Sequence, residues 1–224
     1  MNRHLVVRCV LVAAFVLLVA GVALGATLPY EVDLSNVPNG SLPPGWYPLN
    51  GDWQVVDGTL EGYYPPAAGD GQGAFIFIPN LMVDDFDLQL TMEFKSAAQG
   101  SRFGAIMFRS APATGAPRHK LQIRQRTTDR NGIGLLYRDS DKKATRIGEM
   151  PLHHDFELNT PYRVRLVVFG DRIKLLIEDT LVMDLTARTY LQKGGIGFVV
   201  HGATVRFSNI RIDSVDEEKF NSIY

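Results

Sequence analysis

The sequence contains a single cysteine, Cys9, and its formal net charge is only −1 over 224 residues. One cysteine forms neither an internal disulfide nor a thiolate metal site, so the stability of the fold must come from a hydrophobic core. The small charge excess gives no electrostatic reason to expect nucleic acid as a partner. With 46% hydrophobic and 21% charged residues, the composition excludes an intrinsically disordered chain and indicates one folded domain.

The amino-terminal segment differs in composition from the rest of the chain. Arg3, His4 and Arg8 form a basic start, and residues 9–26 carry no charge. This order, with small residues before a cleavage point, is typical of a signal peptide, so we expect residues 1–26 to direct a secreted, extracellular or periplasmic protein. The uncharged stretch also reaches the lower length limit of a membrane-spanning helix. An uncleaved signal anchor, which would make the membrane a partner, is the alternative.

Beyond residue 26 the hydrophobic period is two. From Phe86 to Phe94, apolar residues alternate with polar ones, which places one side of a strand on a core and the other side in solvent. Similar patterns or short apolar runs predict strands at residues 53–56, 59–63, 74–78, 103–109, 120–126, 133–138, 162–169, 172–178, 181–185, 195–201 and 204–212.

Turn residues separate several of these predicted strands. The pairs Asp57-Gly58, Asn131-Gly132 and Gly170-Asp171 each supply a residue that tolerates a positive φ angle. Many short strands without intervening helices are typical of an antiparallel sandwich or barrel. We therefore predict an all-β fold, an antiparallel two-sheet β-sandwich over residues 27–215, followed by a C-terminal tail at residues 216–224.

Five segments resemble a known family. They are residues 42–46 (LPPGW), 51–60 (GDWQVVDGTL), 85–94 (DFDLQLTMEF), 103–109 (FGAIMFR) and 194–212. They are similar to concanavalin A-like sandwich domains of the laminin G and 3-keto-disaccharide hydrolase type, so the resemblance implies a jelly roll. Related bacterial endoglucanases carry Glu-x-Asp-x-x-Glu on one strand, whereas Glu93 here is followed by Phe94 and Lys95. The resemblance therefore implies the fold and no catalytic dyad of that kind.

Three predicted strands carry rows of hydrogen-bonding side chains on their outward sides. These rows are Gln89, Thr91 and Glu93; Gln122, Arg124 and Arg126; and Arg163 and Arg165. An Arg fork donates and a Glu carboxylate accepts, which suits the hydroxyl and carboxylate groups of sugars. We predict a carbohydrate or glycan ligand held by Glu93, Gln122, Arg124 and Arg126. The alternative is that these rows are the solvent side of antiparallel sheets.

Arg109 and His201 each end an apolar strand where a loop begins, a common place for ligand-binding groups. His201-Gly202 is also similar to the His-Gly before the last strand of keto-disaccharide hydrolase-like domains. Glu93 and His201 are therefore the candidate catalytic residues, although a lone His at a strand end is more often packed. Of Tyr63 and Tyr64, we expect Tyr64 to be the exposed ring that a sugar face could contact.

Calcium is the cofactor to consider. Sandwiches that resemble this one often hold a structural Ca²⁺ where the first and last strands meet, and Asp33 and Asp213 stand at those two places in the sequence. Carboxylate oxygens are suitable Ca²⁺ ligands, but the ion takes six to eight oxygens. The two residues are equally compatible with surface charges at strand ends.

Three functions remain open. The first is a secreted or cell-surface carbohydrate-binding or adhesive module. The second is a glycoside-cleaving enzyme resembling the 3-keto-disaccharide hydrolases, and the third is a structural subunit that assembles through sheet edges. The enzyme hypothesis requires that Glu93, Arg109, Arg124 and His201 converge in one pocket.

Overall fold

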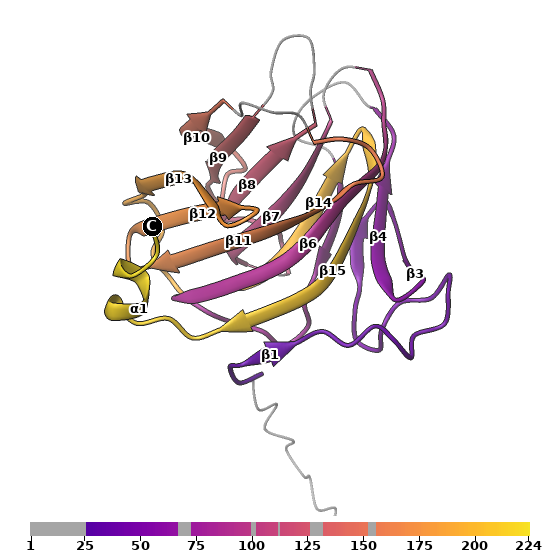
Figure 1. The fold of residues 1–224 in the computed structure, drawn as a ribbon, viewed down its shortest axis with the longest axis horizontal. Coiled ribbons are helices and arrows are strands. Elements are labelled where there is room, and N and C mark those ends of the chain that lie inside the picture. The colour runs from indigo at the N-terminus through magenta and orange to yellow at the C-terminus, as the bar shows by residue number, and fades with distance from the viewer. Residues whose placement is uncertain (1–25, 67–72, 100–101, 112, 126–131, 152–155) are drawn as a thin grey trace, which may run out of the picture.

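The protein folds as two antiparallel β-sheets packed face to face, with one short helix at the end of the described chain (Figure 1). The computed structural model describes residues 26–66, 73–99, 102–111, 113–125, 132–151 and 156–224. The predicted all-β, two-sheet sandwich is confirmed. The expected signal peptide, apart from Ala26, lies outside the described residues. No helix within the described ranges is long and apolar enough to cross a membrane.

The sheets have eight and seven strands within the described residues. The eight-stranded sheet runs through β13 (Thr180–Thr186), β12 (Arg172–Ile177), β11 (Pro161–Phe169), β6 (Phe86–Ala97), β15 (Ala203–Asp213), β4 (Thr59–Tyr64) and β3 (Asp52–Val56), and β1 (Tyr30–Glu31) also pairs with β15. The seven-stranded sheet runs through β10 (Ala144–Met150), β9 (Gly132–Arg138), β8 (Arg118–Arg124), β7 (Phe103–Ser110), β14 (Gly195–His201), β5 (Ala74–Phe77) and β2 (Pro48–Asn50).

The core lies between the sheets and follows the two-residue period. On β6, Leu88 and Met92 are buried in the central cluster, and the intervening Gln89 is exposed. On β8, Leu121 and Ile123 belong to the same cluster. Because successive side chains of a strand point to opposite sides, the residues between them project from the outward faces of the two sheets. Those outward faces are where a ligand could bind.

Two of the predicted turns have the expected geometry. Asp57 and Gly58 have φ angles of 51° and 71° and join the paired residues Val56 and Thr59. Positive φ angles at both central residues match the twist of a two-residue hairpin. Gly170 has a φ angle of 56° in the link between β11 and β12. Asn131, in the third predicted turn, lies outside the described residues.

Residues 216–224, expected as a tail, pack on the eight-stranded sheet. They include the helix α1 (Glu217–Asn221), whose N-cap residue Asp216 accepts a hydrogen bond from the backbone N–H of Lys219. Phe220 is buried together with Val167 and Leu176 of the outward sheet face. α1 therefore covers one region of that face, and no other helix of the described residues lies on it (Figure 1).

Strands β1, β2 and β10 were not predicted. β1 and β2 contain two and three residues, too few to show a period. β10 is an edge strand in which no residue is buried. Ile147 and Met150 of this strand pack only partly against the core, and a register irregularity lies between Arg146 and Gly148. The sequence of β10 therefore carries no period-two pattern.

Candidate functional site

One end of the seven-stranded sheet brings three strand termini into line. His201 ends β14, Phe103 begins β7 and Arg124 ends β8, and the three are consecutive Cα partners across these strands. Ile106 and Ile123 on the same strands point into the core. Phe103 and Arg124 therefore project from the outward face, and the strand spacing puts Arg124 about 10 Å from His201 across the sheet.

Arg124 is the centre of a hydrogen-bonded row on this face. Its Nη1 donates to Oε1 of Glu149 at 3.0 Å, and its Nη2 donates to Oε1 of Gln122 at 3.0 Å. Arg146 forms an ion pair with the second carboxylate oxygen of Glu149. Gln122, Arg124, Glu149 and Arg146 are named the arginine row below. It presents an amide, a carboxylate and two guanidinium groups in a fixed order across β8 and β10.

A glycine on the neighbouring strand β9 makes room for the Arg124 side chain. A Cβ atom on Gly134 would lie 2.7 Å from Nη2 of Arg124, so the missing side chain leaves room for the guanidinium over β9. Arg124 is only 7% exposed, whereas the carboxylate-bearing side chain of Glu149 is 38% exposed. The row therefore runs from a buried, hydrogen-bonded cation to a solvent-accessible carboxylate.

A stack of rings continues from the arginine row toward the eight-stranded sheet. The His201 ring is parallel to Phe103, with centroids 5.3 Å apart, and its other neighbour is Tyr64 at 5.9 Å. Lys120 places its Nζ 4.9 Å from the centre of the Phe103 ring. The expectation that Tyr64 is the exposed tyrosine is wrong. Tyr63 is 42% exposed, whereas Tyr64 is half-buried and packs against the core.

Glu93 lies on the other sheet. It projects from the outward side of β6, where Oε1 accepts a hydrogen bond from Nζ of Lys95 at 2.9 Å, and its Cα partner on β15 is Arg206. The sandwich core separates this side from Gln122 and Arg124. A cradle that joins Glu93 to Gln122 and Arg124 is therefore not formed, and Glu93 and His201 do not face one ligand.

Arg109 is at the opposite end of β7 from Phe103. Its φ angle is 47°, and its side chain, 1% exposed, donates to the carbonyl oxygens of Asp84 and Gly170 and to Oδ1 of Asp85. Burial lowers the pKa of the guanidinium, and the nearby carboxylates partly offset this effect. These contacts tie β7 to two loops of the eight-stranded sheet, which is a structural role.

Replacing Arg109 should therefore affect stability. We expect Arg109→Met to lower the free energy of unfolding by about 2 kcal/mol, because it leaves buried carbonyl groups without a donor. Urea unfolding measures this, with Arg188→Met as the control, since Arg188 is 85% exposed. Equal midpoints for the two variants would contradict the structural role of Arg109.

Asp33 and Asp213 lie at different places along the β1–β15 pair. Glu31 is opposite Arg211 and the strands are antiparallel, so the two aspartates are displaced in opposite directions, about 13 Å apart along the strands. Asp33 accepts hydrogen bonds from Ser35, and Asp213 forms an ion pair with Arg211 at 2.8 Å. The two carboxylates do not meet at one ion, and calcium binding stays a prediction.

The described residues contain no group of three or more His, Cys, Asp or Glu side chains that could hold a metal ion. Arg126, predicted as a ligand-binding residue, lies outside the described residues. Of the remaining predicted ligand-binding residues, the structure brings Tyr64, Gln122, Arg124 and His201 toward one end of the sandwich and places Glu93 and Arg109 elsewhere.

The family model of the 3-keto-alpha-glucoside-1,2-lyase-like domain matches residues 33–213. The chain belongs to this family. The predicted resemblance to 3-keto-disaccharide hydrolase domains is thereby confirmed. Within this lyase-like domain, the arginine row and the ring stack lie on the outward side and at the end of the seven-stranded sheet.

A levanase of Bacillus subtilis strain 168 is 26% identical to the lyase-like domain over 170 residues, which are 76% of this chain and 23% of the levanase. The chain thus spans about a quarter of that relative's length. The carbohydrate-binding module CBM66 from Bacillus subtilis has a TM-score of 0.61 at 23% identity, covering 76% of this chain and 96% of the module. A Bacillus licheniformis beta-glucanase has a TM-score of 0.59 at 11% identity, covering 84% and 100%. These two likenesses show the jelly-roll fold.

Sequence reasoning missed Glu149 and Arg146 in the lyase-like domain. Both belong to β10, which has no period-two pattern, so nothing in the sequence places them beside Arg124. Lys120 and Phe103 stand in predicted strands. The two-residue period places Lys120 on the outward side, but residues 103–108 carry no polar side chain, so alternation does not assign a side to Phe103. Their contact depends on the pairing of β7 with β8.

Proposed function

We propose that this chain is a carbohydrate-binding domain that holds its ligand on the outward face of the seven-stranded sheet. The observation that carries the proposal is the arginine row, in which Arg124 is held in place by Gln122 and Glu149. The domain belongs to a family named for glucoside chemistry, and its fold is shared with a carbohydrate-binding module. The match to part of a levanase also favours a sugar ligand.

The arginine row has the chemistry that sugar recognition needs. Neighbouring hydroxyl groups of a sugar both donate and accept hydrogen bonds, and the row offers guanidinium donors, an amide with both functions and a carboxylate acceptor. Ligand sites combine apolar surface with a few fixed polar groups. Beside the row, Phe103 and Lys120 are buried and pack on each other, so they support the row and do not add exposed apolar surface. Binding of a sugar by hydrogen bonds alone is consistent with this geometry and requires no catalytic pair.

Arg124→Ala tests the proposal. We expect it to weaken glycan binding about tenfold to a hundredfold, because hydrogen bonds to a charged group contribute about 1.5 to 3 kcal/mol. Gln122→Ala should weaken binding less, because it removes only neutral hydrogen bonds to the glycan and leaves Arg124 paired with Glu149. Calorimetric titration with levan, mixed-linkage β-glucan, laminarin and N-acetylglucosamine oligomers measures the affinities.

Arg206→Ala is the matched control, because Arg206 is also paired with a carboxylate, Glu61, but lies on the other sheet. It should bind as the parent does, and thermal unfolding should show that both variants are folded. Unchanged affinity of Arg124→Ala for every glycan that the parent binds would exclude this site. If the parent binds no glycan, the structural-subunit hypothesis takes the place of the proposal.

A further inference from the structure

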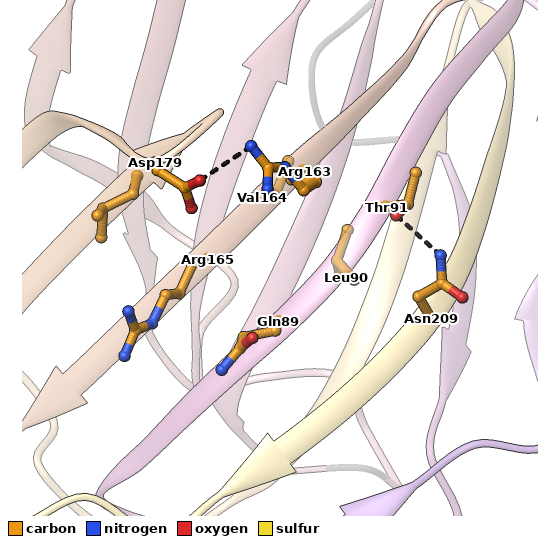
Figure 2. A pocket seen from close by; sticks show the side chains of 9 residues that line it. Gln89, Leu90, Thr91, Arg163, Val164, Arg165, Asp179 and Asn209 are labelled. Atoms are coloured by element: carbon orange, nitrogen blue, oxygen red, sulfur yellow. Dashed lines mark hydrogen bonds and ion pairs between the residues drawn. The ribbon is translucent and has the colours of Figure 1, made fainter.

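A cavity of about 270 Å³ opens on the outward face of the eight-stranded sheet, with the core between it and the arginine row. Figure 2 shows side chains from β6, β11 and β15 around it. The polar residues that line it are Gln89, Thr91, Arg163, Arg165, Asp179 and Asn209. We call this cavity the amide groove, after the side chains of Gln89 and Asn209.

A bulge in β15 forms one side of the amide groove. Ser208 is the Cα partner of Thr91 and Arg211 is the partner of Gln89, so Asn209 and Ile210 together oppose one residue of β6. Asn209 has a φ angle of 51°, a conformation that Asn tolerates better than most residues. The bulge therefore gives the outward face two consecutive polar side chains where a regular strand gives one.

The core does not require this extra residue. Phe207 and Ile210 are buried on either side of Ser208 and Asn209. If Asn209 were absent, Phe207, Ser208 and Ile210 would still alternate inward, outward and inward. The bulge thus contributes nothing to the inward pattern, and its effect is the position of the Asn209 amide. Bulges that re-aim a side chain are frequent beside functional sites.

The cations of the amide groove are already neutralised. Arg165 donates two hydrogen bonds to Asp87, at 2.9 and 2.8 Å, and Asp87 also pairs with Lys219 at 2.9 Å. Arg163 pairs with Glu178 at 3.1 Å and with Asp179 at 2.9 Å. An anionic ligand would have to compete with these carboxylates, so the groove favours a ligand without charge.

Neutral groups remain for such a ligand. Gln89 is exposed, and its amide makes no hydrogen bond to the other residues that line the groove (Figure 2). Nδ2 of Asn209 donates to Oγ1 of Thr91 at 3.1 Å, which leaves the amide oxygen directed away from Thr91 (Figure 2). Two amides and a hydroxyl on neighbouring strands can donate to and accept from adjacent hydroxyl groups.

We propose that the amide groove is a second binding site, which takes a neutral polyhydroxylated ligand such as one or two units of an uncharged oligosaccharide. Gln89 and Asn209 make the contacts, and the paired Arg163 and Arg165 form the wall of the groove. This site is separate from the arginine row and does not depend on it, since the two lie on opposite outward faces.

The test is a titration of the full chain, labelled with ¹⁵N, with cellohexaose, laminarihexaose and levan oligosaccharides. The side-chain amide signals of Gln89 and Asn209 should shift with at least one of these probes. Asn209→Gly keeps the positive φ angle and removes the amide, and Gln89→Ala removes the second amide. Each should weaken this binding about tenfold, as expected for the loss of one or two neutral hydrogen bonds. Gln54→Ala on β3, another outward residue of the same sheet, is the control and should bind as the parent does.

A further variant distinguishes binding at the amide groove from binding at the arginine row. In Arg124→Ala the signals of Gln89 and Asn209 should still shift with the same affinity. If no neutral probe shifts either signal, the amide groove is not a saccharide site, whatever the arginine row binds. Binding of oligogalacturonate alone would also overturn the proposal, because it would show that the paired arginines select an anion. Deletion of Asn209 should keep the fold and weaken the binding seen at the Gln89 signal at least as much as Asn209→Gly does, and undiminished binding by this variant would contradict the role of the bulge.

Discussion

Phe220→Ala is expected to lower the free energy of unfolding by about 3 kcal/mol, the range found for removing a buried aromatic ring. Phe220 is 2% exposed and shares a buried cluster with Val167 and Leu176 on the outward face of the eight-stranded sheet. Arg172 and Lys174 lie over its ring at 4.7 and 4.8 Å. Loss of the ring removes these contacts and exposes the apolar side chains below α1.

Urea unfolding followed by tryptophan fluorescence measures the effect. Tyr224→Ala is the matched control, because Tyr224 belongs to the same segment but is 90% exposed. Its unfolding midpoint should stay close to that of the parent. If Phe220→Ala leaves the midpoint as close to the parent as Tyr224→Ala does, the docking of α1 contributes little to stability. Phe220→Leu, which keeps an apolar side chain, should lie between the parent and Phe220→Ala.

Acid should destabilise the protein through His119. This ring is fully buried, lies parallel to Phe108 with centroids 5.0 Å apart, and has Tyr137 on another side at 5.5 Å. Burial, and secondarily the charge of Arg109, lowers the pKa of His119 to about 4. An unfolded chain binds this proton near pH 6.5. Stability should therefore fall as the pH decreases from about 6.5 to about 4, by about 3 kcal/mol in all.

Unfolding free energies at pH 7 and at pH 4.5 test this prediction. His119→Phe keeps a ring between Phe108 and Tyr137 but binds no proton, so it should lose much less stability between the two pH values. Hydrogen bonds from Arg165 and Lys219 outweigh the effect of burial and lower the pKa of Asp87, so this carboxylate stays ionised at both pH values. If the parent and His119→Phe show parallel losses, His119 is not the group responsible.

The strands with one buried side were predictable from the sequence, because burial imposes the two-residue period. β6 is the clearest case, since Leu88 to Phe94 alternate in burial as they do in polarity. β10 was not predictable, because only Ile147 and Met150 pack partly against the core and a register irregularity between Arg146 and Gly148 interrupts the alternation. α1 is a helix of five residues, too short for a helical period to be recognised.

The candidate site was predictable only within single strands. The period-two pattern correctly gives Gln122 and Arg124 the same outward side of β8. It cannot say to which sheet a strand belongs, and so it grouped Glu93 with Arg124 although the core separates them. The contact between Arg124 and Glu149 depends on the order of β8, β9 and β10 in the sheet. Arg109 has a positive φ angle where the register between β7 and β14 is irregular. The alternation of apolar and polar residues does not reveal such an irregularity.

The bulge at Asn209 left a signal in the sequence, because the apolar residues Phe207 and Ile210 are three positions apart in a strand that otherwise alternates. Since the inward pattern is the same with and without Asn209, a single in-frame codon insertion could have produced the bulge in an ancestor with a regular β15. A deletion could remove it just as easily in a descendant. Relatives of this domain can therefore differ in the amide groove by one codon while sharing the whole core, and length variation at this position would identify them.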